Sequence, residues 1–144
     1  VVEGNKRVSV LKYFGAVSIQ ANVIRKIPRY SEDYNIKLYY ELMKFNDITG
    51  LCTVEFTKLG QAEQLLNLIG KTTKWDNEDR ENFNRIMFSF AKAYEFRGGK
   101  RLPITVGDAI SAFMDVYGYE ATSKMTERDF NDNILKVWNY LRNM

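Results

Sequence analysis

The chain has 144 residues, of which 45% are hydrophobic and 14% aromatic, and its formal net charge is +3. This composition predicts one folded domain and excludes a disordered chain, while the absence of histidine excludes Ser-His-Asp triads and histidine-based zinc sites. Because the single cysteine, Cys52, cannot form an intramolecular disulfide and no apolar run approaches ~20 residues, we expect a soluble, intracellular protein, cytoplasmic or nuclear.

Positive charge is concentrated at the start of the chain. The first 30 residues contain one acidic residue, Glu3, whereas residues 31–144 contain 15 basic and 17 acidic residues. The basic residues of the first 30 are Lys6, Arg7, Lys12, Arg25, Lys26 and Arg29. Such an excess indicates an anionic partner, either nucleic acid phosphates or an acidic membrane surface. We therefore predict a single globular domain over residues 1–144 with a basic N-terminal segment, residues 1–30.

Two patterns compete within residues 8–27. Residues 17–23 alternate apolar and polar side chains, which is the period of a half-buried strand. Apolar residues also recur every three or four positions, which is typical of an amphipathic helix; these are Val10, Phe14, Val17, Ala21 and Ile24. The pattern does not decide between strand and helix. Pro28 ends either element, because the residue before a proline is disfavoured in the helical conformation.

Five amphipathic helices are predicted after residue 30. The first has Ser31 as its N-cap and the apolar stripe Tyr34, Leu38, Leu42 and Phe45. The second covers residues 59–69, and the third is long, begins after Asp76 and ends at Gly98 and Gly99. The last two begin at the capping pairs Thr105 with Asp108 and Thr126 with Asp129.

Alternation over residues 52–57 predicts a short strand, with a lead-in to the second helix as the alternative. The predicted fold class is mainly α, with about five helices in one compact domain. A small N-terminal β element, giving an α+β fold, is the alternative.

Basic and aromatic residues are interleaved in the N-terminal segment, as in Lys12-Tyr13-Phe14 and Arg29-Tyr30. Cations release counterions from phosphates, and aromatic rings stack on exposed bases. A further cluster of cations follows the third helix and extends the same surface if the fold brings the two together. The candidate nucleic-acid-binding residues are Lys6, Arg7, Lys12, Arg25, Lys26, Arg29, Arg97, Lys100 and Arg101. The alternative is an ordinary solvated, charged face with the tyrosines partly in the core.

Tyr39 and Tyr40 are candidate partner-binding residues. Adjacent helix positions lie ~100° apart, so the two rings cannot share one narrow buried stripe. Exposed tyrosines are common in protein interfaces, which indicates contact with another protein or self-association. A wide buried helix face is the alternative interpretation.

No motif for catalysis is present. The acidic cluster Asp76, Glu78, Asp79 and Glu81 fits either a magnesium site or the first turn of a helix, where acids are favoured by the helix dipole. We predict a non-catalytic binding and assembly module that contacts an anionic partner through its basic N-terminal segment, by analogy with viral or phage structural proteins. We expect no cofactor and no metal. The alternatives are a protein–protein adaptor domain without nucleic acid and a metal-dependent enzyme that uses carboxylates.

Overall fold

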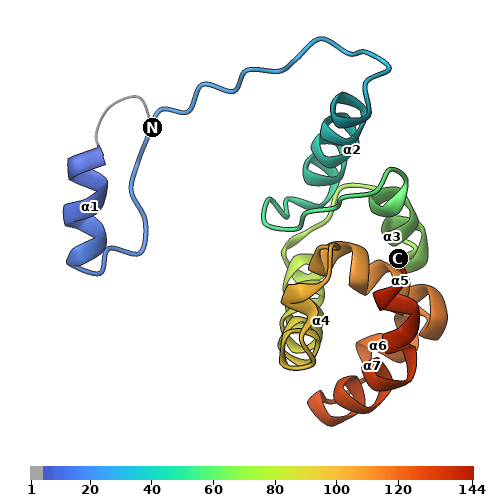
Figure 1. The fold of residues 1–144 in the computed structure, drawn as a ribbon. Helices are drawn as coiled ribbons and strands as arrows, with labels where there is room; N and C mark the ends of the chain where they lie inside the picture. Colours follow the sequence, from blue (N-terminus) through green and yellow to red (C-terminus); the bar gives the residue numbers. More distant parts are fainter. Residues whose placement is uncertain (1–4) are drawn as a thin grey trace.

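The structure is a computed structural model that describes residues 5–144 (Figure 1). Its elements are α1 (Asn5–Tyr13), α2 (Tyr34–Thr49), α3 (Gln61–Ile69), α4 (Asn77–Phe96), the 3₁₀ turn η1 (Gly99–Arg101), α5 (Val106–Tyr117), α6 (Tyr119–Ser123) and α7 (Glu127–Arg142). The prediction of a mainly helical chain is confirmed. No strand occurs within residues 5–144, so the β elements expected in the N-terminal segment and over residues 52–57 are wrong for these residues.

The N-terminal segment contains a short helix followed by an extended chain. Helix α1 is terminated by the turn at Gly15, whose φ of 74° is favourable for glycine. In this turn the N–H of Gly15 donates to the Lys12 carbonyl, and the N–H of Ala16 donates to the Leu11 carbonyl. Beyond this turn, residues 17–27 are neither helical nor paired as a strand. The helical stripe predicted through Ile24 fails because Gly15 ends the helix first.

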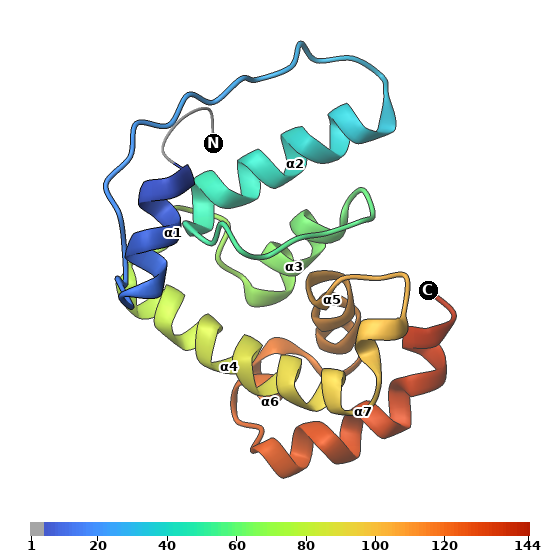
Figure 2. The same cartoon turned by 60° about the vertical axis from the view of Figure 1, so that its left-hand side comes forward.

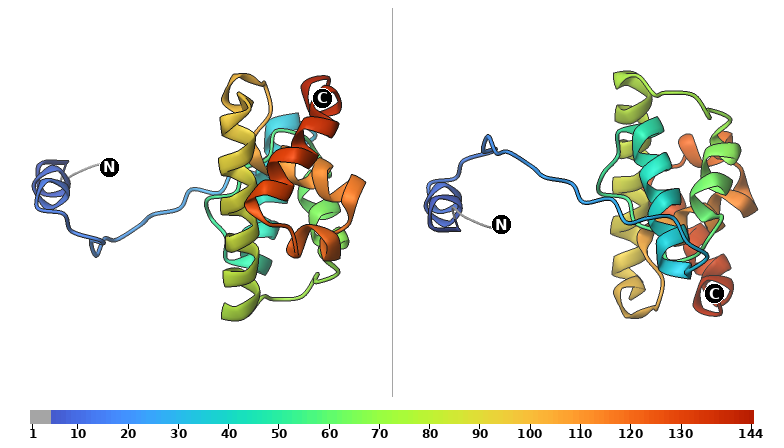
Figure 3. Two further views of the ribbon diagram at one scale, coloured as in Figure 1. Left: turned by 90° about the horizontal axis from the view of Figure 1, so that it is seen from below. Right: turned by 90° about the horizontal axis from the view of Figure 1, so that it is seen from above.

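Residues 5–27 are exposed and lie away from the packed helices (Figures 1 and 3). We call residues 5–30 the basic arm and residues 34–144 the helical body. Residues 1–4, including Glu3, lie outside the described residues. The buried core extends only from Phe45 to Leu141, so the arm adds no side chain to it. A single compact domain over the whole chain stays a prediction.

Helix α5 lies at the centre of the helical body (Figure 2). All eight residues from Gly107 to Met114 are buried, as expected for a helix that is surrounded by others. It packs against α3, α4, α6 and α7, and α4 also packs along α7. The sequence predicts an amphipathic helix here, whereas the first eight residues after Val106 are buried on all sides.

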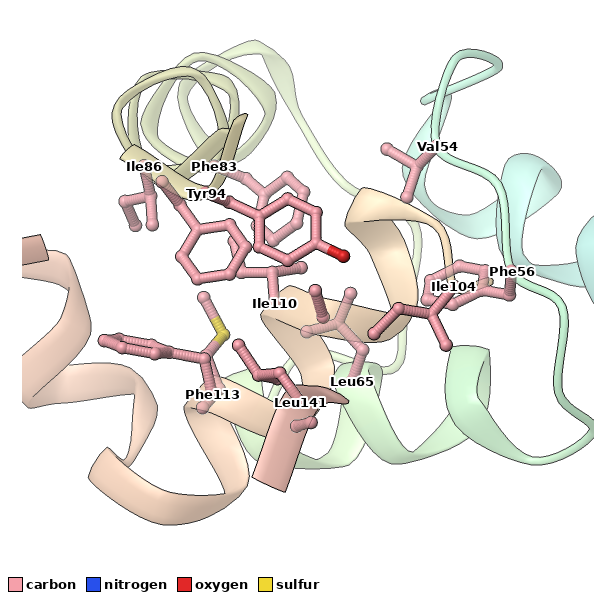
Figure 4. Packing of buried hydrophobic residues seen from close by; sticks show 14 of the residues in the cluster. Val54, Phe56, Leu65, Phe83, Ile86, Tyr94, Ile104, Ile110, Phe113 and Leu141 are labelled. Atoms are coloured by element: carbon pink, nitrogen blue, oxygen red, sulfur yellow. The ribbon is translucent and has the colours of Figure 1, made fainter. Parts of the chain in front are cut away.

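Aromatic side chains fill the space between α4, α5 and α7. The ring of Phe90 lies 5.2 Å from that of Phe113 and 6.1 Å from that of Phe130, measured between centroids. Tyr94 stacks on Phe90 and is almost completely buried, with its hydroxyl directed among apolar side chains (Figure 4). Most of the large rings on these helices are thus used to build the core.

Side-chain caps begin the major helices, largely where the sequence predicts them. Thr105 with Asp108 and Thr126 with Asp129 form complete capping boxes at α5 and α7, and so do Asp76 and Asp79 at α4. Helix α2 is different, because its N-cap is Asp33 and not Ser31: the Asp33 carboxylate accepts from the N–H groups of Asn35 and Ile36.

Residues 51–60 form a loop that leads into α3, and not the strand that the alternation predicts. The Asp108 carboxylate, fully buried, accepts the N–H of Thr57 at 3.1 Å and the hydroxyl of Thr57 at 2.6 Å. The hydroxyl of Thr105 donates to the Glu55 carbonyl at 2.6 Å. The start of α5 therefore satisfies the loop's polar groups, which replaces the strand pairing that the alternation predicted.

Candidate functional site

The basic arm contains six cations, and all six are exposed. They are Lys6, Arg7, Lys12, Arg25, Lys26 and Arg29. Every ion pair found within residues 5–144 joins residues beyond position 31, so none of these cations has a carboxylate partner in the described part of the chain. Unpaired, solvated cations are the groups that can exchange counterions for phosphates at little desolvation cost.

Cations and apolar residues are interleaved around α1. At ~100° per residue, its three cations point to three different sides of the helix, with valine and leucine side chains between them. These apolar residues are Val8, Val10 and Leu11, all exposed. A helix that lies on a membrane needs its apolar and basic residues on opposite faces. Helix α1 therefore presents positive charge in several directions and has no apolar face suited to lipid.

Aromatic rings are also exposed along the arm. Tyr13 and Phe14, at the end of α1, are 85% and 78% exposed, and their rings meet edge to face with centroids 5.3 Å apart. Tyr30 is exposed at the other end of the arm. Exposed rings next to cations are the groups that bind single-stranded nucleic acids, because a base can stack on the ring while its phosphate meets the cation.

A tyrosine cluster, formed by Tyr30, Tyr39 and Tyr40, joins the arm to α2. The hydroxyl of Tyr40 donates to the carbonyl of Pro28 at 2.8 Å, and its ring meets that of Tyr30 edge to face at 5.3 Å. The guanidinium of Arg25 donates from Nε to the Tyr39 hydroxyl at 3.2 Å. This hydrogen bond, with the proximity of Tyr39, raises the pKa of Arg25 above its usual value. Arg25 therefore keeps its charge while its position is fixed against α2.

Tyr39 and Tyr40 are both half-buried. The ring of Tyr30 completes the cluster. The sequence marks Tyr30 only as an aromatic residue beside Arg29, and its contact with Tyr40 was not predicted. The two tyrosines predicted as partner-binding thus contact the chain's own arm. Contact with another protein stays a prediction for them.

The first turn of α2 is attached to the loop over residues 51–60. The hydroxyl of Tyr34 donates to the Thr57 carbonyl at 2.9 Å, and Thr57 is in turn bound by Asp108 of α5. A continuous set of hydrogen bonds therefore runs from the central helix to the point where the arm leaves the body. This set fixes the base of the arm, whereas residues 17–27 have no hydrogen bond from their backbone groups to the rest of the described chain.

The second group of predicted cations lies elsewhere. Arg97 follows α4, and Lys100 and Arg101 belong to η1. All three are exposed, and Lys100 pairs with Glu95 at 2.8 Å. No hydrogen bond or ion pair within residues 5–144 joins them to the arm. The structure does not bring the two groups of cations into contact, and their role in binding stays a prediction.

Comparison of the chain with protein-family models, curated proteins and solved structures finds no match.

The acidic cluster at the start of α4 serves the helix. Asp79 accepts the N–H of Asp76 at 3.0 Å and forms an ion pair with Lys71. That pair is the main cause of a lowered pKa for Asp79. Residues 5–144 contain no group of three or more potential metal-ligating side chains. None of the described helices combines the length and apolar character that a membrane crossing requires.

The body carries several depressions that are open to solvent. A depression of about 120 Å³ lies between α2 and α3, with Phe45, Ile48 and Leu66 in its lining and Glu41 and Glu63 beside them. Substrate pockets usually enclose ~300 Å³ or more, so this depression does not suit a small-molecule substrate. A wider groove of about 650 Å³ runs along α2 beside Tyr30 and Tyr40, and a depression of about 400 Å³ lies between the end of α4 and the start of α7; both are open to solvent and do not enclose a ligand. The most distinctive surface of the described chain is therefore the arm and its junction.

Proposed function

We propose that the chain is a non-catalytic nucleic-acid-binding and assembly module whose contact with phosphates is made by the basic arm. The observation that carries this proposal is the presence of six exposed cations on the arm without a carboxylate partner among the described residues. The helical body holds the base of the arm through the tyrosine cluster and the Tyr34 hydrogen bond. Residues 17–24, which no backbone hydrogen bond ties to the body, can follow an irregular phosphate backbone.

Single-stranded nucleic acid suits the arm better than a lipid surface. The interleaved residues of α1 provide no apolar face for a bilayer, whereas Tyr13, Phe14 and Tyr30 provide rings on which unpaired bases stack. Each such stacking contact contributes ~1–3 kcal/mol in nucleic-acid complexes. The extended residues 17–27 can also lie along a single strand of nucleic acid, because no backbone hydrogen bond ties them to the body.

A protein–protein adaptor is the second candidate, favoured by the outer surface of α4. Phe88 and Phe96 are 73% and 86% exposed there, and large exposed rings are frequent at protein interfaces. This candidate leaves the charge of the arm unexplained. It predicts that binding to a partner survives neutralisation of the arm and is lost when Phe88 and Phe96 become alanine.

Two matched triple variants test the proposal. One replaces Arg25, Lys26 and Arg29 of the arm by glutamine, and the other replaces Arg97, Lys100 and Arg101. The change in net charge is the same in both, so only its place differs. Binding to a fluorescein-labelled, single-stranded RNA is measured by anisotropy at about 50 mM salt, where phosphate contacts are strong. Unfolding in urea checks that both variants stay folded.

We expect the arm variant to bind RNA at least ten-fold more weakly, since each phosphate contact contributes on the order of 1 kcal/mol at low salt. The second variant shows whether the cations after α4 contribute. Equal binding by the arm variant and the unmodified chain would overturn the proposal. Weakening by the second variant alone would place the site at η1 instead of the arm.

A further inference from the structure

Residues 13–24 form an uncharged stretch inside an otherwise basic arm, bounded by Lys12 and Arg25. Within it, residues 17–23 alternate apolar and polar side chains and are extended, and Val17 and Val23 are 103% and 85% exposed. Their backbone N–H and C=O groups have no partner within the described chain. Uncharged, β-branched segments without proline or glycine are the ones that readily pair with another strand.

The helical body has no sheet that could receive this segment, since residues 5–144 contain no strand. A β-pairing partner for this segment must therefore come from outside its own copy. We propose that residues 16–24 pair, antiparallel, with the same residues of a second copy, with the two Gln20 residues opposite each other. This pairing rests on the proposed function in one respect: bound nucleic acid brings the two arms together.

The alternation selects the register. With Gln20 at the centre, Val17 faces Val23 and Ile19 faces Ala21, so these four apolar side chains of each copy lie on one face of the ribbon. Ala16 faces Ile24 at the two ends of the ribbon, on the other face. A shift by one residue places Ile19 opposite Gln20 or Asn22 and places Ala21 opposite Ser18 or Gln20, so the central apolar pairs are lost. Centres at Ile19 or Ala21 keep the apolar face but pair Val23 with Gly15, whose φ is positive, or Val17 with Arg25. Gln20 is thus the centre that uses all nine residues.

Charge repulsion between the arms is small in this register. Arg25 of one copy lies beyond the ribbon, level with Gly15 of the other, and Lys26 is level with Phe14. Lys12 belongs to α1 and lies outside the ribbon. No cation meets a cation directly, so like-charge repulsion across the ribbon, which is destabilising for opposite pairs, is avoided.

A two-stranded ribbon is only marginally stable in water. Two copies on one nucleic acid strand hold their arms at an effective concentration on the order of millimolar, without any new contact between the bodies. We therefore expect pairing to be much stronger on an RNA long enough for two copies than in free solution. Nucleic acid binding and self-association are then coupled through the same arm.

Cysteine cross-linking tests both the pairing and its register. Cys52 is exposed and is replaced by serine in every variant. Gln20→Cys places two thiols opposite each other, within the ~4.4–6.8 Å between Cα atoms that a disulfide requires. Ser18→Cys or Asn22→Cys places each thiol ~13 Å from its own counterpart, because four residues separate them along the strand. A mixture of the last two variants again brings the thiols opposite each other.

Each variant is incubated with oligo-uridine RNA of roughly 40 nucleotides, a length that offers more than one binding site, and is oxidised under mild conditions. We expect a covalent dimer for Gln20→Cys and for the mixture, and little for Ser18→Cys or Asn22→Cys alone. The chain that keeps only its native Cys52 measures disulfides formed by random collision. Cross-linking of all single variants to an equal extent, or no cross-linking in the RNA-bound sample, would overturn the proposal.

RNA binding by the same variants is measured under reducing conditions. Intact binding without cross-links overturns the pairing and leaves the proposed function in place. Cross-links without RNA binding support the pairing and overturn the nucleic-acid function. As an independent check, Ile19→Pro removes a backbone N–H and should abolish the dimer of Gln20→Cys while the arm keeps its charge.

Discussion

Replacing Asp108 by alanine is expected to destabilise the helical body far more than an ordinary helix cap does. The Asp108 side chain is fully buried, and its carboxylate accepts the N–H of Thr57 at 3.1 Å, the Thr57 hydroxyl at 2.6 Å and the N–H of Thr105 at 3.0 Å. Two of these donors belong to the loop over residues 51–60. Asp108 therefore connects that loop to α5 and, through Thr57 and Tyr34, holds the base of the arm.

The expected cost follows from the donors that are left without acceptors. An unsatisfied buried donor costs ~1–3 kcal/mol in the free energy of unfolding. Asp108→Ala leaves the N–H groups of Thr57 and Thr105 without an acceptor, whereas the Thr57 hydroxyl can rotate toward another acceptor. The sum is roughly 3–5 kcal/mol, which is a large part of the ~5–15 kcal/mol that stabilises a typical domain. Urea unfolding followed by circular dichroism at neutral pH measures the loss.

Asp129 provides a matched control. It forms the same capping box with Thr126 at α7, accepting the N–H of Thr126 at 2.8 Å, but it is exposed and reaches no other loop. Asp129→Ala should cost only ~1 kcal/mol, the usual value of a cap. If Asp108→Ala costs no more than Asp129→Ala, the reasoning is refuted. Should Asp108→Ala fail to fold, Asp108→Asn keeps one accepting oxygen and allows the comparison.

Two further substitutions test the packing. Gly107→Ala should lower the unfolding midpoint sharply although alanine favours helices, because its Cβ would lie 2.2 Å from the Glu55 carbonyl oxygen; an unchanged midpoint would contradict this close approach. Tyr94→Phe should be at least as stable as the unmodified chain at neutral pH, since the Tyr94 hydroxyl is buried without a partner. Burial and the charge of Asp108 raise the pKa of Tyr94 to about 12. The contribution of the protonated Tyr94 hydroxyl to the free energy of unfolding is therefore fully present below pH 10 and is lost as the pH rises from 10 to 12. Urea unfolding at about pH 9 and about pH 11 should therefore show a steeper loss for the unmodified chain than for Tyr94→Phe, and equal losses would disprove the shift.

The sequence predicted the helical body well where local signals agree with packing. Capping pairs at Thr105 and Thr126, and glycines after the helices, are short-range features that need no knowledge of the fold. The loop over residues 51–60 could not be predicted in this way. Its alternation resembles a strand, but its conformation depends on Asp108, which lies 51 residues from Thr57 in the chain. The conformation of such segments is determined by hydrogen bonds between residues that are far apart in the chain.

The residue types that form the site could be predicted from the sequence, whereas their arrangement in space could not. The cations of the arm are visible as a charge bias in the first 30 residues. The folding back of Tyr30 onto Tyr40, and of Arg25 onto Tyr39, depends on where Pro28 directs the chain relative to α2. The separation of Arg97, Lys100 and Arg101 from the arm likewise depends on how α4 lies in the body. The number of residues between these side chains in the sequence predicts neither their contacts with α2 nor the separation of the two groups of cations.

The decisive test of phosphate binding by the basic arm is the salt dependence of RNA binding by the whole chain. If the six arm cations contact phosphates of a single strand, the logarithm of the affinity should fall with the logarithm of salt concentration with a slope of about −4. Binding should then weaken roughly 300-fold between about 50 and about 200 mM salt, and glutamine at Arg25, Lys26 and Arg29 should reduce the slope by about 2. Binding that is insensitive to salt, or a slope that the arm variant leaves unchanged, would contradict the account.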